Sequence, residues 1–358
     1  MKKITHEVHY MNAEKIILSK ERNVSLTAYI QDAGGEFGFT ERPAMLVIPG
    51  GGYAMCSDRE ADPVATAYLK AGYQAFILRY TVRDKGGWPL PLQDYERAMA
   101  LIVENAEKWH IDKAKIAVAG FSAGGHLAAC AATIAEHRPA AAVLVYPAVL
   151  KDIVDMCQPG MPYPHEHVTA GTCPCFFAAA RDDRTVAIQN TLTMEMALAE
   201  HGVPFESHIY SYGGHGFSSA EDWINTNTVC PRLPRWLPDS IGWLSETMGK
   251  LTRGGFTEPC TAGSMNGDLA PVLSVDCSLS HLRRQREDVR SVLAPMFSGI
   301  EAVAGMRGFS VEGLMNAVGN NTAREIMEMV QIPAETIATI DKALHQMLNK
   351  TEIQGDIK

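Results

Sequence analysis

The chain has 358 residues, of which 46% are hydrophobic, so it can bury a large core and it exceeds the usual size of one domain. Its net charge of −9, with 32 lysines and arginines, argues against a nucleic-acid or anionic-membrane partner and favours a small or neutral substrate. No stretch is long and apolar enough to span a membrane, and the first residues lack the apolar core of a signal peptide, so the predicted location is the cytoplasm.

Apolar runs alternate with helical stretches over residues 1–249, which we take as the first domain. Strands are predicted at 44–48, 74–78, 115–119, 141–145, 175–179 and 206–210, and helices at 63–71, 92–109, 126–132, 188–201 and 241–248. The strands are apolar throughout, which is typical of a parallel sheet covered by helices on both faces. The segment 16–31 is predicted as one or two antiparallel edge strands. The fold class is therefore α/β.

The composition changes after this domain. Residues 250–271 are rich in Thr, Gly, Ser, Pro and Asn and have no apolar periodicity, which predicts a linker. Residues 272–358 show only helical patterns, the clearest of which repeats at spacings of three and four through Ile337, Ile340, Leu344 and Met347. This predicts a small all-helical C-terminal domain, which is a candidate surface for homo-oligomerisation or for docking to a partner.

A candidate nucleophile lies in the sequence Gly120-Phe121-Ser122-Ala123-Gly124. It follows an apolar strand and precedes an alanine-rich helix, which is the strand, sharp turn and helix of a nucleophile elbow. A Cβ at Gly120 or Gly124 would crowd the neighbouring strand or helix, and the serine backbone is predicted to be strained. The motif alone is short enough to occur by chance, so its flanking elements carry the prediction.

A serine hydroxyl needs a base, and the base needs an acid that fixes its tautomer. In the α/β-hydrolase order both follow the serine after later strands. His215 lies between glycines after strand 206–210, and Asp182 and Asp183 follow strand 175–179. We favour Asp183, because the acid is commonly followed three residues later by an apolar residue, here Val186, that leads into a helix. Asp182 is then a turn-forming or capping residue that binds local backbone amides.

Three consecutive glycines follow strand 44–48 in Pro49-Gly-Gly-Gly-Tyr53. The amides of Gly51 and Gly52, with that of Ala123, are the predicted oxyanion hole. A phosphate-binding loop is excluded, because no lysine follows at the required spacing. Tyr53, Arg59 and Glu60 lie just beyond and are candidate substrate-binding residues; the equal alternative is a core aromatic residue and a structural ion pair.

Neither a cofactor nor a metal is implied by the sequence. The pair Cys173 and Cys175 opens an apolar strand and has no His or Cys partner at ligand spacing. The eight cysteines contain no C-x-x-C pair, which favours reduced thiols over a disulfide framework.

Several stretches together resemble the esterase and lipase group of the α/β hydrolases, which includes acetyl esterases, acetylxylan esterases and feruloyl-esterase-like enzymes. The resemblance covers residues 15–248 and rests on these matches: Pro49-Gly-Gly-Gly-Tyr53, Ser57-Asp-Arg-Glu-Ala-Asp-Pro63, Leu78-Arg-Tyr80, Trp88-Pro-Leu-Pro-Leu-Gln-Asp94, Gly120-Phe-Ser-Ala-Gly-Gly-His126 and Gly213-Gly-His-Gly-Phe217. Pro49 replaces the histidine of the usual His-Gly-Gly-Gly loop, which puts the support of that loop in question. The segment 147–173 is short for the group, which predicts a small lid and an open site.

The resemblance implies a serine esterase that removes acetyl or other short acyl groups from plant-cell-wall oligosaccharides such as xylan fragments. A peptidase or a thioesterase would use the same triad, and a hydrolase-like binding protein without activity is the alternative from another class. The tail resembles, more faintly, a helical module appended to bacterial carbohydrate-active enzymes, and no active-site residue is implied there.

Overall fold

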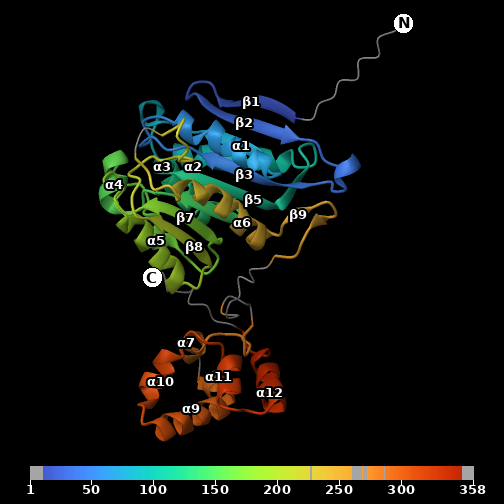
Figure 1. The fold of residues 1–358 in the computed structure, drawn as a ribbon, viewed down its shortest axis with the longest axis vertical. Coiled ribbons are helices and arrows are strands. Elements are labelled where there is room, and N and C mark those ends of the chain that lie inside the picture. The colour runs from blue at the N-terminus through green and yellow to red at the C-terminus, as the bar shows by residue number, and fades with distance from the viewer. Residues whose placement is uncertain (1–10, 226–227, 260–267, 269–271, 286, 349–358) are drawn as a thin grey trace, which may run out of the picture. The chain divides into compact units, whose positions relative to one another are not determined.

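A computed structural model describes residues 11–225, 228–259, 268, 272–285 and 287–348. The chain divides into two compact units, residues 1–260 and 261–358. The first unit is an α/β fold built on one eight-stranded sheet, and the second contains helices (Figure 1). The predicted fold class is therefore confirmed.

The sheet has the strand order β1-β2-β4-β3-β5-β6-β7-β8. Its strands are β1 Met11–Ser19, β2 Val24–Gln31, β3 Arg42–Ile48, β4 Gln74–Arg79, β5 Ile111–Phe121, β6 Ala141–Val145, β7 Cys175–Ala180 and β8 Phe205–Tyr210. The pairs β1/β2 and β2/β4 are antiparallel, and the pairs from β4/β3 to β7/β8 are parallel. The carboxyl ends of the six parallel strands therefore meet at one edge, where the loops that carry function in such sheets lie.

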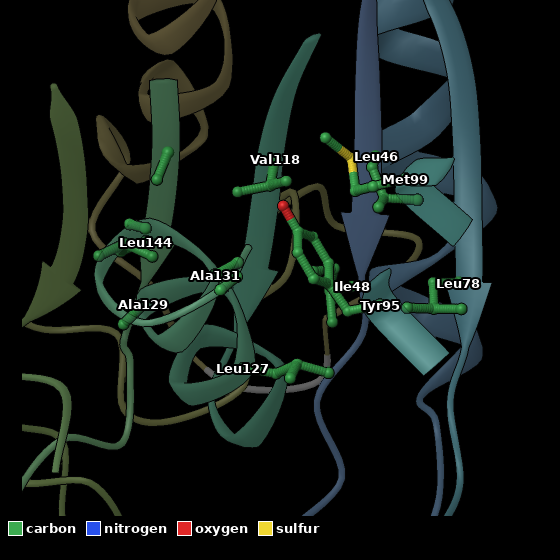
Figure 2. Close-up of a cluster of buried hydrophobic side chains, with 14 of the residues drawn as sticks. Leu46, Ile48, Leu78, Tyr95, Met99, Val118, Leu127, Ala129, Ala131 and Leu144 are labelled. Atoms are coloured by element: carbon green, nitrogen blue, oxygen red, sulfur yellow. The ribbon is translucent and has the colours of Figure 1, made fainter. Parts of the chain in front are cut away.

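Helices cover both faces because the strands are apolar on both sides. The main helices of this unit are α1 Asp62–Lys70, α2 Leu90–Glu104, α3 Ala123–Thr133, α4 Lys151–Cys157, α5 Gln189–Glu200 and α6 Trp236–Met248. Leu46 and Ile48 of β3 pack into a core with α2, α3 and α5, while Met45 and Val47 pack into a second core with α1 and α6. Figure 2 shows the first core, in which Val118 lies near Tyr95 and Met99 of α2. The alternation along one strand thus fills two apolar layers.

The first unit extends beyond the predicted boundary at residue 249. A short hairpin, β9 Leu251–Thr252 and β10 Gly255–Phe256, lies inside the predicted linker 250–271. Lys115 Nζ donates to the Met248 carbonyl at 2.6 Å and lies 4.7 Å from the centre of the Phe256 ring. The sequence did not predict this hairpin, because two-residue strands around a glycine turn show no apolar periodicity.

The second unit contains six helices in its described part. They are α7 Leu279–Arg283, α8 Glu287–Val292, α9 Ala294–Arg307, α10 Val311–Ala317, α11 Ala323–Met329 and α12 Ala334–Leu344. Leu282, Met296 and Ile326 lie in one apolar cluster, and the side chains of Ser278 and Thr322 cap α7 and α11. Caps matter here because helices this short are marginal without tertiary packing.

Candidate active site

Ser122 occupies a strained turn between β5 and α3. Its φ of 52° and ψ of −116° lie outside the regions that non-glycine residues favour. A Cβ on Gly120 would lie 2.3 Å from the Gly124 carbonyl oxygen, and one on Gly124 would lie 2.1 Å from the Ile48 carbonyl oxygen. The predicted steric need for both glycines is confirmed, and the turn lifts the serine hydroxyl out of the sheet.

The structure brings the three predicted triad residues together. Ser122 Oγ lies 2.9 Å from His215 Nε2, and His215 Nδ1 lies 2.6 Å from Asp183 Oδ2. The Asp183 side chain is 2% exposed and that of His215 is 19% exposed. A carboxylate at Nδ1 keeps the proton on that nitrogen, so the Nε2 lone pair faces the serine hydroxyl. The arrangement can therefore take a proton from Ser122.

The two neighbouring aspartates make different contacts. Asp183 follows β7, and its Oδ1 accepts from the amides of Thr185 and Val186 at 2.8 and 2.9 Å, which leaves Oδ2 for His215. Asp182 Oδ1 accepts from the amides of Gly213 and Gly214 at 2.9 and 3.0 Å. These amides, the Gly214 amide most strongly, lower the pKa of Asp182.

The expectation that Asp182 binds local amides covers only its weakest backbone contact, which is with its own amide. Its two stronger partners lie about 30 residues further along the chain, in the loop that carries His215. β7 and β8 are parallel neighbours, so their carboxyl ends bring the two loops together. Asp182 binds the backbone of the loop that carries His215, while Asp183 binds the His215 side chain itself.

The glycine loop lies directly against the elbow. A Cβ on Gly50 would lie 2.9 Å from Ser122 Cβ, and one on Gly51, whose φ is +128°, would lie 2.3 Å from the Met55 carbonyl oxygen. Among the described residues, the amides of Gly51 and Gly52 have no hydrogen-bond acceptor. Ala123 is the first residue of α3, where an amide has no acceptor within the helix. The assignment of these three amides to the oxyanion hole remains a prediction.

Support for this loop comes from two buried side chains. Tyr80 donates its hydroxyl to the Pro49 carbonyl at 2.8 Å, and Glu60 Oε2 accepts from the Gly50 amide at 2.7 Å. Pro49 replaces the usual histidine, but the loop keeps its support, because the Tyr80 hydroxyl binds the main-chain carbonyl of residue 49. The hydrogen bond to Glu60 fixes the first glycine and so the direction of the two that follow.

Glu60 also connects this loop to the loop of the base. Its Oε1 accepts from the Tyr146 hydroxyl at 2.7 Å, and the Tyr146 oxygen accepts from the Ser218 amide at 3.0 Å. The Tyr146 ring packs edge-on against His215, with 4.9 Å between the ring centres. Burial raises the pKa of Glu60, and its two hydrogen-bond donors oppose that rise.

Of the two roles left open for Glu60, the structure supports the structural one, because the residue is 3% exposed and both its oxygens have donors within the protein. Tyr146 was missed by the sequence reading. The available signal was its position: it directly follows β6, and polar groups at the carboxyl ends of parallel strands lie near the site.

Tyr53 is a core residue and does not line an open site. It is 4% exposed, its hydroxyl lies 2.7 Å from His126 Nδ1, and its φ of 57° accompanies this inward position. His126 Nε2 lies 2.8 Å from the Pro162 carbonyl oxygen, so Nε2 carries the proton and Nδ1 accepts from Tyr53. Burial lowers the pKa of His126 to about 4, which keeps this link neutral.

Arg59 is exposed to solvent, whereas Tyr53 and Glu60 are buried. Its guanidinium lies 3.6 Å from the position that a Cβ on Gly216 would take, next to His215. Among the three candidate substrate-binding residues, only Arg59 is both open to solvent and next to the base. Its role stays a prediction.

No group of three or more His, Cys, Asp or Glu side chains is arranged to hold a metal ion in the part of the chain that the structure describes. Within the same residues, no helix is long and apolar enough to cross a bilayer.

The fold and the elbow define an α/β hydrolase, and the comparisons with known proteins agree. Residues 38–144 match the BD-FAE family. The solved structure of an α/β hydrolase enzyme from a Medee basin deep-sea metagenome library is 37% identical with a TM-score of 0.62, and the match covers 67% of this chain and 99% of that one. The chain belongs to the α/β hydrolases.

Two further relatives carry more specific names. The acetyl ester-xyloside bifunctional hydrolase from Caldicellulosiruptor lactoaceticus is 29% identical with a TM-score of 0.57, covering 65% of this chain and 95% of that one. The acetylxylan esterase of Xylanibacter ruminicola is 27% identical over 219 residues, which are 54% of this chain and 45% of that protein. The chain spans less than half the length of the curated relatives that it matches first.

Proposed function

We propose that this protein is a serine esterase that hydrolyses acetyl and other short acyl esters. The observation that carries the proposal is the chain of contacts from Ser122 Oγ to His215 Nε2 at 2.9 Å and from His215 Nδ1 to Asp183 Oδ2 at 2.6 Å. Ser122 attacks the ester carbonyl while His215 takes its proton. Asp183 holds the imidazole in the required tautomer and stabilises the imidazolium that forms.

The remaining steps follow from the same groups. The amides of Gly51, Gly52 and Ala123 donate to the oxyanion of the tetrahedral intermediate, an interaction worth about a hundredfold to a thousandfold in rate per donor. His215 then gives its proton to the leaving alcohol, and the acyl group stays on Ser122. Water, deprotonated by His215, attacks this acyl-enzyme and releases the acid, which restores the serine.

The proposed substrate is an acetylated plant-cell-wall oligosaccharide such as a xylan fragment. The names of the relatives from Xylanibacter ruminicola and Caldicellulosiruptor lactoaceticus support an acetyl ester on a xylose-based sugar. The net charge of −9 supports a neutral substrate over an anionic one. Arg59, exposed beside the base, is the candidate contact for the sugar.

The test combines labelling with a substrate panel. A fluorophosphonate should label the wild-type chain at Ser122 alone, and Ser122→Ala should lose the label and about a millionfold in kcat, as removing a nucleophilic serine does elsewhere. Ser291→Ala, an exposed serine in the helical unit, is the control and should behave as wild type. Labelling at another residue contradicts the mechanism, and no labelling at all favours the inactive binding protein.

The panel separates the reaction classes. We expect hydrolysis of aryl acetate faster than butyrate or ferulate, and release of acetate from acetylated xylo-oligosaccharides. Faster cleavage of a peptide or an acyl thioester would assign the same triad to a peptidase or a thioesterase.

A further inference from the structure

A cavity of about 790 Å³ lies at the amino ends of the parallel strands, away from the candidate active site. The loop after β2, the first residue of β3, the end of α1 and the β9/β10 hairpin border it, and they contribute Phe37, Arg42, Lys70 and Arg253. Arg42 begins β3, whereas the glycine loop follows the end of that seven-residue strand. At about 3.3 Å per residue the two places are about 20 Å apart, so the cavity is separate from the catalytic groups.

Arg42 is a buried cation without a carboxylate partner. It is 4% exposed; its Nε and Nη2 donate to the Asp32 carbonyl at 3.0 and 2.7 Å, and its Nη1 donates to the Gly72 carbonyl at 3.1 Å. No acidic side chain of the described residues forms an ion pair with it. Burial lowers the pKa of Arg42, and the nearby charge of Asp32 opposes this. A guanidinium has five N–H donors, so each terminal nitrogen keeps one N–H for a ligand.

Two further cations border the cavity. Lys70 and Arg253 are exposed, and neither side chain has an ion-pair or hydrogen-bond partner among the described residues. The loop after β2 packs directly on the hairpin, since a Cβ on Gly38 would lie 2.4 Å from the Arg253 carbonyl oxygen. The lining residues carry three positive charges and one negative charge, that of Glu36, in a chain whose net charge is −9. Such a local excess of positive charge attracts anions.

Two aromatic rings hold the buried cation and add an apolar surface. The rings of Phe37 and Phe39 are stacked with 5.5 Å between their centres, and the guanidinium carbon of Arg42 lies 5.3 and 4.9 Å from those centres. These cation–π contacts fix the guanidinium at the cavity. Phe37 is 46% exposed. The face of an aromatic ring carries partial negative charge, so it suits the C–H groups of a sugar.

We propose that this cavity binds a sugar acid such as glucuronate. The carboxylate binds Arg42, Lys70 and Arg253, the C–H face of the sugar packs on Phe37, and the hydroxyls donate to Glu36. Two simpler anions fit less well. Inorganic phosphate has no apolar face and its second charge is repelled by Glu36, while benzoate has no hydroxyl to donate to that carboxylate. The binding uses none of the catalytic groups and so does not depend on the esterase activity.

Isothermal titration calorimetry of the full chain with glucuronate tests the site. We expect one glucuronate per chain, and a rise of about tenfold in Kd for Arg253→Glu, because the change replaces an attraction by a repulsion. Arg307→Glu makes the same charge change at an exposed arginine of the helical unit and should bind as wild type. Lys70→Glu is the second variant, and circular dichroism reports the folding of each. Absence of binding by wild type, or a Kd that is unchanged in both Arg253→Glu and Lys70→Glu, overturns the proposal.

A comparison of ligands tests the chemical class. We expect glucose, benzoate and inorganic phosphate each to bind more weakly than glucuronate. Phe37→Ala should raise the Kd for glucuronate by about threefold to tenfold and leave any binding of phosphate unchanged, because phosphate makes no contact with the ring. Glucose that binds as tightly as glucuronate would show that the cations do not recognise a carboxylate. Tighter binding of phosphate or benzoate would contradict the assignment to a sugar acid.

Discussion

The two units of this chain use their buried groups in different ways. The first unit buries Asp183, Glu60 and His126 near the carboxyl ends of its strands, and each is held by hydrogen bonds to other segments. The core of the helical unit is mostly aliphatic, and its three buried polar side chains in the described residues, Ser274, Ser278 and His281, lie in or just before α7. Buried polar groups are costly unless they are satisfied, so their concentration in one unit indicates where the chemistry lies.

The largest effect on activity is expected within the first unit, at its two adjacent aspartates. Asp183→Asn should lower kcat by about 10⁴-fold, because an amide cannot hold the proton on His215 Nδ1 in the same way. Asp182→Asn should cost far less, since its remaining oxygen can still accept from the amides of Gly213 and Gly214. Steady-state kinetics on an aryl acetate measure both. The reverse ranking would mean that Asp182 is the acid.

The buried His126 should give the first unit a pH-dependent stability. Its pKa falls from 6.5 in the unfolded chain to about 4 in the fold, so the unfolded state binds the proton more readily. The contribution of His126 to the free energy of unfolding is complete above pH 6.5 and is lost as the pH falls toward 4. The total loss is about 3 kcal/mol. Urea unfolding of wild type and His126→Gln across this range should show the steeper loss in wild type. Parallel curves would contradict the assignment.

The contacts of Glu60 predict a smaller effect on the reaction. Glu60→Gln keeps an acceptor for the Gly50 amide, and Tyr146→Phe removes the hydroxyl that joins Glu60 to Ser218. Each should lower kcat by about tenfold to a hundredfold with KM within about threefold, because the groups that stabilise the transition state lose their alignment.

Tyr68→Phe is the matched control for that pair. Its buried hydroxyl bonds Ser240 of α6 and none of the candidate catalytic groups, so its loss should change stability and leave kcat near wild type. Equal losses of kcat in Tyr68→Phe and Tyr146→Phe would show that the Glu60 contacts are structural only.

The smallest expected effect is the removal of the helical unit. A chain ending at residue 260 keeps the β9/β10 hairpin and the contact of Phe256 with Lys115. Its kcat on a small aryl acetate should stay within about tenfold of the full chain, because none of the candidate catalytic groups lies in the second unit. A truncated chain that folds by circular dichroism and is inactive would show that this unit completes the site.

Much of the fold and of the site could be predicted from the sequence. The parallel strands were predicted because they are apolar on both faces, and Ser122, Asp183 and His215 because each follows a strand in the expected order. The contact between Glu60, Tyr146 and Ser218 could not be predicted, because three distant segments form it. For Tyr53 the sequence left a pocket position and a core position open, because its place next to the glycine loop does not give the direction of its side chain.

The hydrogen bond from Tyr80 to Pro49 has a consequence for how this loop varies in evolution. The acceptor is the main-chain carbonyl of residue 49, which every amino acid has. The side chain at that position is therefore not needed for this hydrogen bond as long as a tyrosine is kept at position 80, and a proline can stand there. A motif search that demands His-Gly-Gly-Gly would overlook such chains, whereas a search that pairs the three glycines with Tyr80 and Glu60 would retain them.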